Sequence, residues 1–147
     1  MGSKDLRIGD WVNFYDQPRK VYDIRNEKAC VVDKNDCGEF SSYFHISPIP
    51  LTEKLLRKLS EGDYNLKNGQ MYQANIKIPT KEEAPIMQEY ISLSRCVFEE
   101  DTWRAWIGYG DFGSVVKCVY HLRNVKYVHE LQHLFWGLGH NLKIAII

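Results

Sequence analysis

Apolar and polar residues alternate over several short runs in the first third of the chain. The runs cover residues 11–15, 20–24, 29–32 and 39–46, and turn-forming segments at 9–10, 16–18 and 35–38 separate them. Alternation with a period of two is typical of half-buried strands. Short strands at about ten-residue spacing predict a small meander or an SH3-like β unit over residues 1–50.

A linking helix is predicted directly after this unit. Pro48 and Pro50 interrupt the strand pattern, and Thr52 follows as a helix N-cap with Glu53 in the first turn. Apolar side chains at helical spacing then lie on one face, and Gly62 ends the helix. These apolar residues are Leu55, Leu56 and Leu59.

The remaining chain predicts an antiparallel sheet packed by a C-terminal helix. Strand patterns cover residues 70–78, 86–98, 102–109 and 114–122, and a short terminal strand is expected at 142–147. Asn124 is the expected cap of the last helix, and Gly137 and Gly139 its end. Its apolar stripe consists of Val128, Leu131, Leu134, Phe135 and Leu138. The fold class is therefore α+β, with units at 1–50 and 51–147 that either stay separate or form one compact domain.

Composition and charge narrow the classes of function. The chain of 147 residues is 44% hydrophobic, and its formal net charge is zero. A folded core is expected, and binding to bulk nucleic acid is disfavoured because it requires an excess of basic charge. A net charge of zero does not exclude a local basic pocket. No run approaches the roughly 18 apolar residues of a membrane span, and the first ten residues hold no apolar leader. The four cysteines form no C-x-x-C pair, which favours reduced thiols in a cytoplasm.

One string argues for a zinc peptidase. His129-Glu-Leu-Gln-His133 has the H-E-x-x-H pattern, in which two imidazoles four apart on a helix share one metal and the glutamate polarises its water. A glycine and a histidine follow at Gly137 and His140, each one residue later than the metzincin spacing requires. Seven residues after His140 leave no room for a further motif, and the amphipathic pattern places His129 and His133 on the solvated flank. We therefore predict no metal and no catalytic residues, and keep a zinc hydrolase using His129 and His133 as an alternative.

Three strings carry a resemblance to a known family. They are Leu6-Arg-Ile-Gly-Asp-Trp-Val12, Tyr43-Phe-His-Ile-Ser-Pro-Ile-Pro-Leu-Thr52 and Val125-Lys-Tyr-Val-His-Glu-Leu-Gln-His133. In this order they resemble a family of small uncharacterised proteins of phages, prophages and mobile elements in Bacteroides-like bacteria. The resemblance implies a mobile-element origin and a bacterial cytoplasm, but no activity. The family pattern carries glutamine and asparagine where this chain has Glu130 and His133, so it implies that the zinc string is particular to this member.

Aromatic residues beside basic ones are the candidate ligand-binding groups, because rings and cations together can hold a nucleobase. A glycine-punctuated loop at 108–113 could also present backbone amides to a phosphate. The candidates are Tyr15, Arg19, Lys20, Tyr43, His45, Trp103, Arg104, Trp106, Tyr109, Asp111 and Phe112. Core packing of the tryptophans and a plain hairpin turn at the glycines are the competing interpretations.

The leading functional hypothesis is a non-catalytic binding protein, without a cofactor, that serves a phage or mobile element. Its expected partner is a nucleotide-type small molecule or a host defence protein, which would make it an anti-defence protein. A nucleic-acid or protein docking module in the SH3-like unit is the second hypothesis. A homo-oligomer paired through residues 142–147 is left open.

Overall fold

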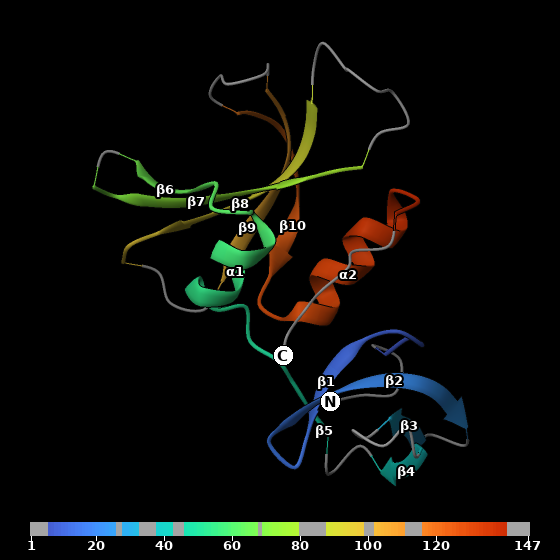
Figure 1. The fold of residues 1–147 in the computed structure, drawn as a ribbon. Coiled ribbons are helices and arrows are strands. Elements are labelled where there is room, and N and C mark those ends of the chain that lie inside the picture. The colour runs from blue at the N-terminus through green and yellow to red at the C-terminus, as the bar shows by residue number, and fades with distance from the viewer. Residues whose placement is uncertain are drawn as a thin grey trace.

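The computed structural model describes residues 6–25, 28–32, 38–42, 46–67, 69–79, 88–98, 102–110 and 116–140. Within these ranges the chain forms two five-stranded antiparallel sheets and two helices (Figure 1). The first sheet precedes helix α1, and the second sheet lies between α1 and α2 in the chain. The α+β fold class predicted from the sequence is thus confirmed. Neither helix is long and apolar enough to span a membrane, as far as the described residues extend.

The first sheet has the strand order β4-β3-β2-β1-β5. Its strands are β1 (Trp11–Phe14), β2 (Gln17–Arg25), β3 (Lys28–Val32), β4 (Gly38–Ser42) and β5 (Ile46–Pro48). Strands β1 to β4 form a meander, and β5 returns to pair with β1, where Pro48 lies opposite Val12. The sequence predicted one strand at 39–46 and the end of the unit at 47–50, whereas the structure has two strands, β4 and β5, and β5 extends the sheet to Pro48. The SH3-like assignment and the boundary at residue 50 stay predictions.

The turn between β1 and β2 is tighter than the sequence suggested. Tyr15 and Asp16 both have positive φ, at 48° and 61°, which is the backbone of the two-residue hairpin turn that matches strand twist. The predicted turn at residues 16–18 therefore begins one residue earlier, and Pro18 belongs to β2.

The second sheet is a simple meander with the order β10-β9-β8-β7-β6. Its strands are β6 (Tyr64–Lys67), β7 (Met71–Lys77), β8 (Gln88–Cys96), β9 (Trp103–Gly110) and β10 (Lys117–Val125). The strand predicted at 86–98 is confirmed by β8, in which Ile91 and Leu93 belong to the hydrophobic core and Ser92 and Ser94 lie on the other face. Strand β6 was not predicted.

The two helices cover one face of the second sheet, which we call the helix face (Figure 1). Helix α1 (Glu53–Leu59) begins as predicted, since the Thr52 hydroxyl accepts the Leu55 N–H at 3.2 Å. Helix α2 (Val128–Gly137) begins later than predicted, because Asn124 lies in β10 and the helix N-cap is Tyr127. The apolar stripe of α2 is confirmed for Val128, Leu131 and Phe135, which are buried, and for Leu134, which is partly buried against the same core; Leu138 is exposed.

The opposite face of the second sheet carries buried polar side chains. Asn75 Oδ1 accepts hydrogen bonds from Gln73 Nε2 at 2.8 Å and from Ser92 Oγ at 2.6 Å. The sheet is strongly curved, because Gln73 on β7 lies 3.9 Å from Cys118 Sγ on β10, three strands away. A Cβ at Gly108 would lie 2.7 Å from Val116, so glycine permits this curvature.

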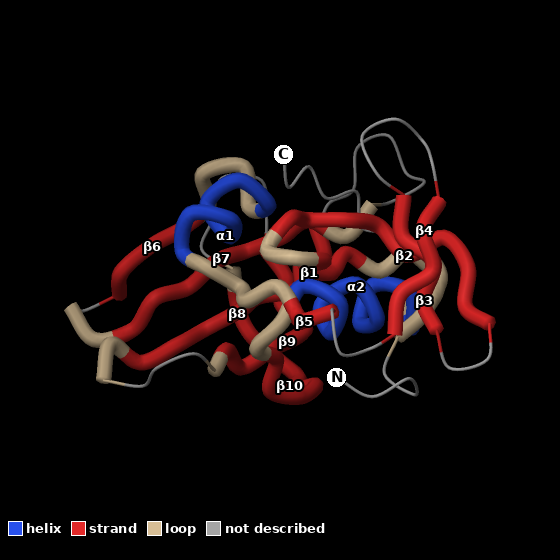
Figure 2. Tube along the Cα trace, turned by 90° about the horizontal axis from the view of Figure 1, so that it is seen from below, coloured by secondary structure: helices blue, strands red, loops and turns tan. Residues whose placement is uncertain are grey.

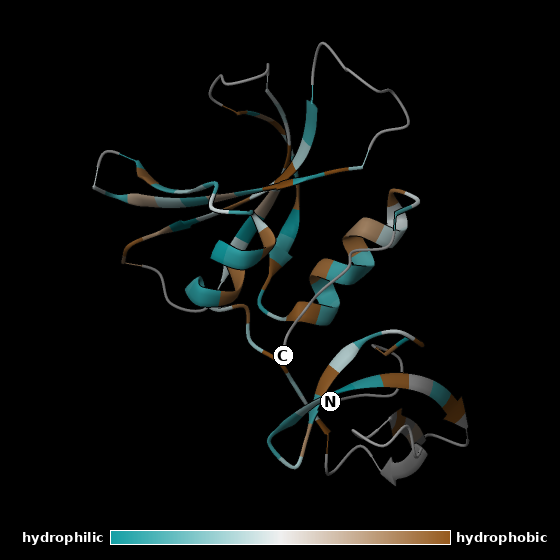
Figure 3. Cartoon of the chain, viewed as in Figure 1, coloured by the Kyte–Doolittle hydropathy of each residue, from teal (hydrophilic) through white to brown (hydrophobic). Residues whose placement is uncertain are grey.

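The described residues form two separate hydrophobic clusters. One cluster joins both helices to the second sheet, and the other lies within the first sheet around Val12, Val21 and Val31. Helix α2 lies between the two sheets in the ribbon view (Figure 1), and the tube view from below shows α2 beside β1 and β5 of the first sheet (Figure 2). Hydropathy colouring shows brown residues of α2 among teal ones, consistent with a helix that contacts an apolar core on one side only (Figure 3).

Candidate functional site

The His-Glu-x-x-His string lies in the first two turns of α2, where its glutamate holds the start of the helix. Glu130 Oε1 accepts the backbone N–H groups of Lys126 and Tyr127 at 2.9 and 3.1 Å. Its other oxygen is 2.8 Å from the Arg123 guanidinium. A carboxylate at this position compensates unpaired N–H groups and the positive end of the helix dipole. Both oxygens are thus engaged in contacts that stabilise the helix N-terminus.

His129 is buried, which contradicts the predicted solvated position. The residue is 5% exposed. The ring stacks on Tyr127 with an interplanar angle of 8° and meets His133 edge to face, with ring centroids 5.6 Å apart. The amphipathic stripe alone did not reveal this burial, because the first sheet covers a second side of the helix.

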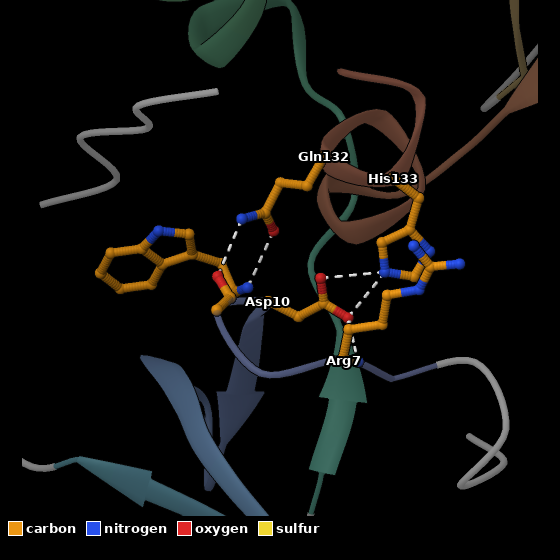
Figure 4. A network of polar contacts seen from close by, with 6 residues as sticks. Arg7, Asp10, Gln132 and His133 are labelled. Carbon is orange, nitrogen blue, oxygen red and sulfur yellow. Dashed lines mark hydrogen bonds and ion pairs between the residues drawn. The ribbon is translucent and has the colours of Figure 1, made fainter. Parts of the chain in front are cut away.

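His133 contacts a buried carboxylate from the first sheet. Its Nε2 lies 3.0 and 2.9 Å from the two oxygens of Asp10, which is 0% exposed (Figure 4). Asp10 also accepts the Arg7 N–H at 2.7 Å. Burial raises the pKa of Asp10 above its ordinary 3.8, and the Arg7 and His133 contacts only partly oppose this rise. The predicted solvent-facing position of His133 is therefore also wrong.

Gln132 forms the second contact between α2 and the first sheet. Its Oε1 accepts the Trp11 N–H and its Nε2 donates to the Gly9 carbonyl, both at 2.9 Å (Figure 4). One carboxamide thus pairs with the backbone as a neighbouring strand would. Sequence reasoning missed Gln132 and Asp10. A single sequence offers no signal for contacts between residues so far apart in the chain.

Trp136 completes the contact by lying against Gly9. A Cβ at Gly9 would be 3.2 Å from Trp136 Cζ2, and Gly9 has a φ of +99°, which favours glycine. The Trp136 ring stacks on His133 at 5.4 Å, and the Arg7 guanidinium lies 6.0 Å from its centroid. Gln132, His133 and Trp136, on one side of α2, therefore pack closely on the segment that leads into β1.

This arrangement bears directly on the zinc alternative. No group of three or more His, Cys, Asp or Glu side chains that could hold a metal is present in the described ranges. A zincin glutamate must reach the metal-bound water, whereas both Glu130 oxygens contact the start of α2 and Arg123. In this structure Glu130 stabilises the N-terminus of α2, and His133 contacts Asp10 at the start of the first sheet.

The raised pKa of Asp10 predicts a pH-dependent effect of Asp10→Asn. Because the folded state favours the protonated carboxyl, the Asp10 contribution to stability is fully present below pH 3.8 and is lost as pH rises through the folded pKa. Wild type should therefore lose stability relative to Asp10→Asn as pH rises above 3.8 and through the raised folded pKa of Asp10, measured by urea denaturation. Asp16→Asn makes the same change at an exposed turn and is the matched control. A gap that widened in favour of wild type with rising pH would contradict the assignment.

The predicted ligand-binding tryptophans lie on opposite faces of the second sheet. Trp103 is 2% exposed and belongs to the hydrophobic core on the helix face, so its assignment as a ligand-stacking residue was wrong. Arg104 and Trp106 point to the opposite face, where Arg104 is exposed and Trp106 half-buried. Cross-strand register places Arg104 beside Asn124 and Trp106 beside His121 on β10. We call Arg104, Trp106, His121 and Asn124 the β9–β10 patch.

Contacts within the β9–β10 patch order its aromatic surface. The Trp106 and His121 rings meet edge to face with centroids 5.0 Å apart. His121 Nε2 lies 3.3 Å from Asn124 Oδ1. Sequence reasoning missed His121 and Asn124, because the register of β10 on β9 is not visible from the strand pattern alone.

The other predicted ligand-binding residues are not brought to this patch. Tyr15 is exposed on the β1–β2 turn of the first sheet, with Arg19 and Lys20 nearby in β2. Tyr109 alternates with Gly108 and Gly110 and faces the helix side of its strand. Those two glycines belong to β9 and make room for Val116, so the predicted phosphate-binding loop does not begin at residue 108. Four predictions fall outside the described residues: Tyr43, His45, Asp111 and Phe112; the predicted strand at 142–147 does too.

Comparison with family models, curated proteins and solved structures finds no match for this chain.

Proposed function

We propose that this protein is a non-catalytic binding protein that takes a nucleotide-type small molecule at the β9–β10 patch. The observation that carries the proposal is the cross-strand register that places Trp106 beside His121 and Arg104 beside Asn124. The β9–β10 patch combines an aromatic surface, a guanidinium and polar side chains on two adjacent strands. The assignment of Glu130 to the start of α2 supports binding over hydrolysis.

The chemistry of the patch suits a base that carries phosphate. A nucleobase stacks on an aromatic face, and such stacking is worth about 1–3 kcal/mol per base. Arg104 would supply positive charge and paired donors for a phosphate, and Asn124 would offer both a donor and an acceptor to a base edge. A formal net charge of zero is compatible with one such local site, although it disfavours extended nucleic acid.

The biological role that we propose is sequestration of a host nucleotide signal in the cytoplasm of a bacterium that carries a phage or mobile element. This role rests on the family resemblance together with the patch. A non-catalytic protein of this kind would lower the free concentration of the signal by stoichiometric binding. Its effect would then depend on its own abundance and affinity.

Trp106→Ala is expected to weaken nucleotide binding about tenfold or more, because it removes the stacking surface. The probe is a panel of cyclic and linear nucleotides, screened by thermal shift and followed by calorimetry of any ligand that stabilises wild type. Tyr15→Ala is the matched control, since it removes an exposed aromatic side chain from the other sheet. No stabilisation by any nucleotide at millimolar concentration would remove the proposal, as would equal loss in both variants.

A further inference from the structure

We propose that the contact between α2 and the first sheet is a latch, which opens as one step while both sheets stay folded. The latch consists of Gln132, His133 and Trp136 on α2 and of residues 7–11 before and at the start of β1. This inference is independent of the nucleotide proposal, because none of these residues belongs to the β9–β10 patch.

The separate cores allow the sheets to part without unfolding. Among the described residues, the cluster around Val12, Val21 and Val31 consists of side chains of the first sheet and of Leu6 before it, and the larger cluster unites the second sheet with both helices. The two clusters share no buried residue, and Trp11 is the residue of β1 that packs partly against the larger one. Opening would therefore expose little of either core, so its main cost is the loss of the latch contacts.

The chemistry of the latch makes it an all-or-none contact. Gln132 makes both of its backbone bonds from one carboxamide, so a small displacement loses the Trp11 and Gly9 bonds together. The same displacement separates His133 from Asp10, which no longer has a partner from α2. Since each bond has a narrow range of length and angle, intermediate positions are unfavourable.

A backbone pivot lies beside the latch. Pro48 is paired with β1 and moves with the first sheet. Ile49 accepts the Val128 N–H at 2.9 Å, and Leu51 donates to the Lys126 carbonyl, so these residues move with α2. Because Pro48 is bonded to the first sheet and Ile49 to α2, the hinge lies at the peptide bond between these two residues. Opening there would uncover His129 and Gln132, both buried in the closed form.

Gln132→Ala tests the latch by removing both backbone bonds at once. Loss of both hydrogen bonds should make the open population roughly tenfold larger or more. Amide hydrogen exchange at Trp11 should accelerate about tenfold, whereas exchange in β2 and in β7 to β9 should stay as in wild type. Small-angle scattering should show an increased radius of gyration. Gln73→Ala is the matched control, because it removes an equally buried glutamine whose contacts lie within the second sheet.

Two outcomes would overturn the latch. One is equal acceleration of exchange in both sheets of Gln132→Ala, which would show that they unfold as one cooperative unit. The other is unchanged exchange at Trp11. If Gln132→Ala does not fold, Gln132→Glu provides the test, because it keeps the acceptor for the Trp11 N–H and loses the donor to Gly9. It should give a smaller acceleration confined to residues 9–11, and a global loss of protection would again contradict the proposal.

Discussion

Replacing Trp103 with alanine is expected to lower the free energy of unfolding by about 3–5 kcal/mol, the usual cost of removing a buried aromatic side chain. Trp103 is fully enclosed between the second sheet and the helices. The Arg95 guanidinium lies 5.1 Å from its ring centroid and Tyr64 meets it edge to face at 6.4 Å. The substitution therefore loses packing, a cation–π contact and an aromatic contact together.

Trp106→Ala is the control for this prediction, and chemical denaturation followed by circular dichroism is the measurement. Because Trp106 is half-buried on the opposite face, its loss should cost no more than about 1 kcal/mol. Similar destabilisation by both variants would contradict the placement of the two tryptophans on a core face and a surface face.

His133→Ala is expected to destabilise the protein by about 3 kcal/mol at neutral pH, because it leaves the buried Asp10 carboxylate without its side-chain partner. The cost should shrink in acid, where the Asp10 carboxyl takes up a proton and no longer carries a buried negative charge. Urea denaturation at neutral and acidic pH measures both effects.

A double mutant separates this explanation from simple loss of packing. Asp10→Asn combined with His133→Ala removes the charge as well as the imidazole, so it should be more stable at neutral pH than His133→Ala alone. An additive double mutant, or a cost that stayed constant with pH, would show that the Asp10–His133 contact has no electrostatic role.

Much of the fold could be predicted because most of its elements are local patterns. Thr52 and the leucines after it are sufficient to identify α1, although the helix ends at Leu59 with Ser60 as its C-cap and not at the predicted Gly62. The alternation in β8 identifies its two faces. Strand β6 was missed because Tyr64 and Leu66 are its only apolar residues and the segment is short. Asn124 resembled a helix cap, but the ladder with β9 continues through Val125.

The candidate site was predicted less well than the fold, and its two parts differ in how much the sequence could show. Alternation already places Trp103 and Trp106 on opposite faces, and Ala105 and Ile107 beside Trp103 in that alternation could have shown which face is the core. The contact between α2 and the first sheet could not have been found in this way. Gln132 and Trp11 are 121 residues apart, and a single sequence contains no signal for a pairing across that separation.

Strand β10 has a consequence for behaviour in concentrated solution. It ends the second sheet among the described strands, and its exposed side chains include Val119, Tyr120 and Leu122. A flat apolar edge of this length would template fibrils from other copies. Register shifts flank Val119 and Leu122 and divide the edge into short stretches, so few consecutive backbone groups remain aligned for an incoming strand. These bulges let the chain carry an apolar edge while opposing polymerisation.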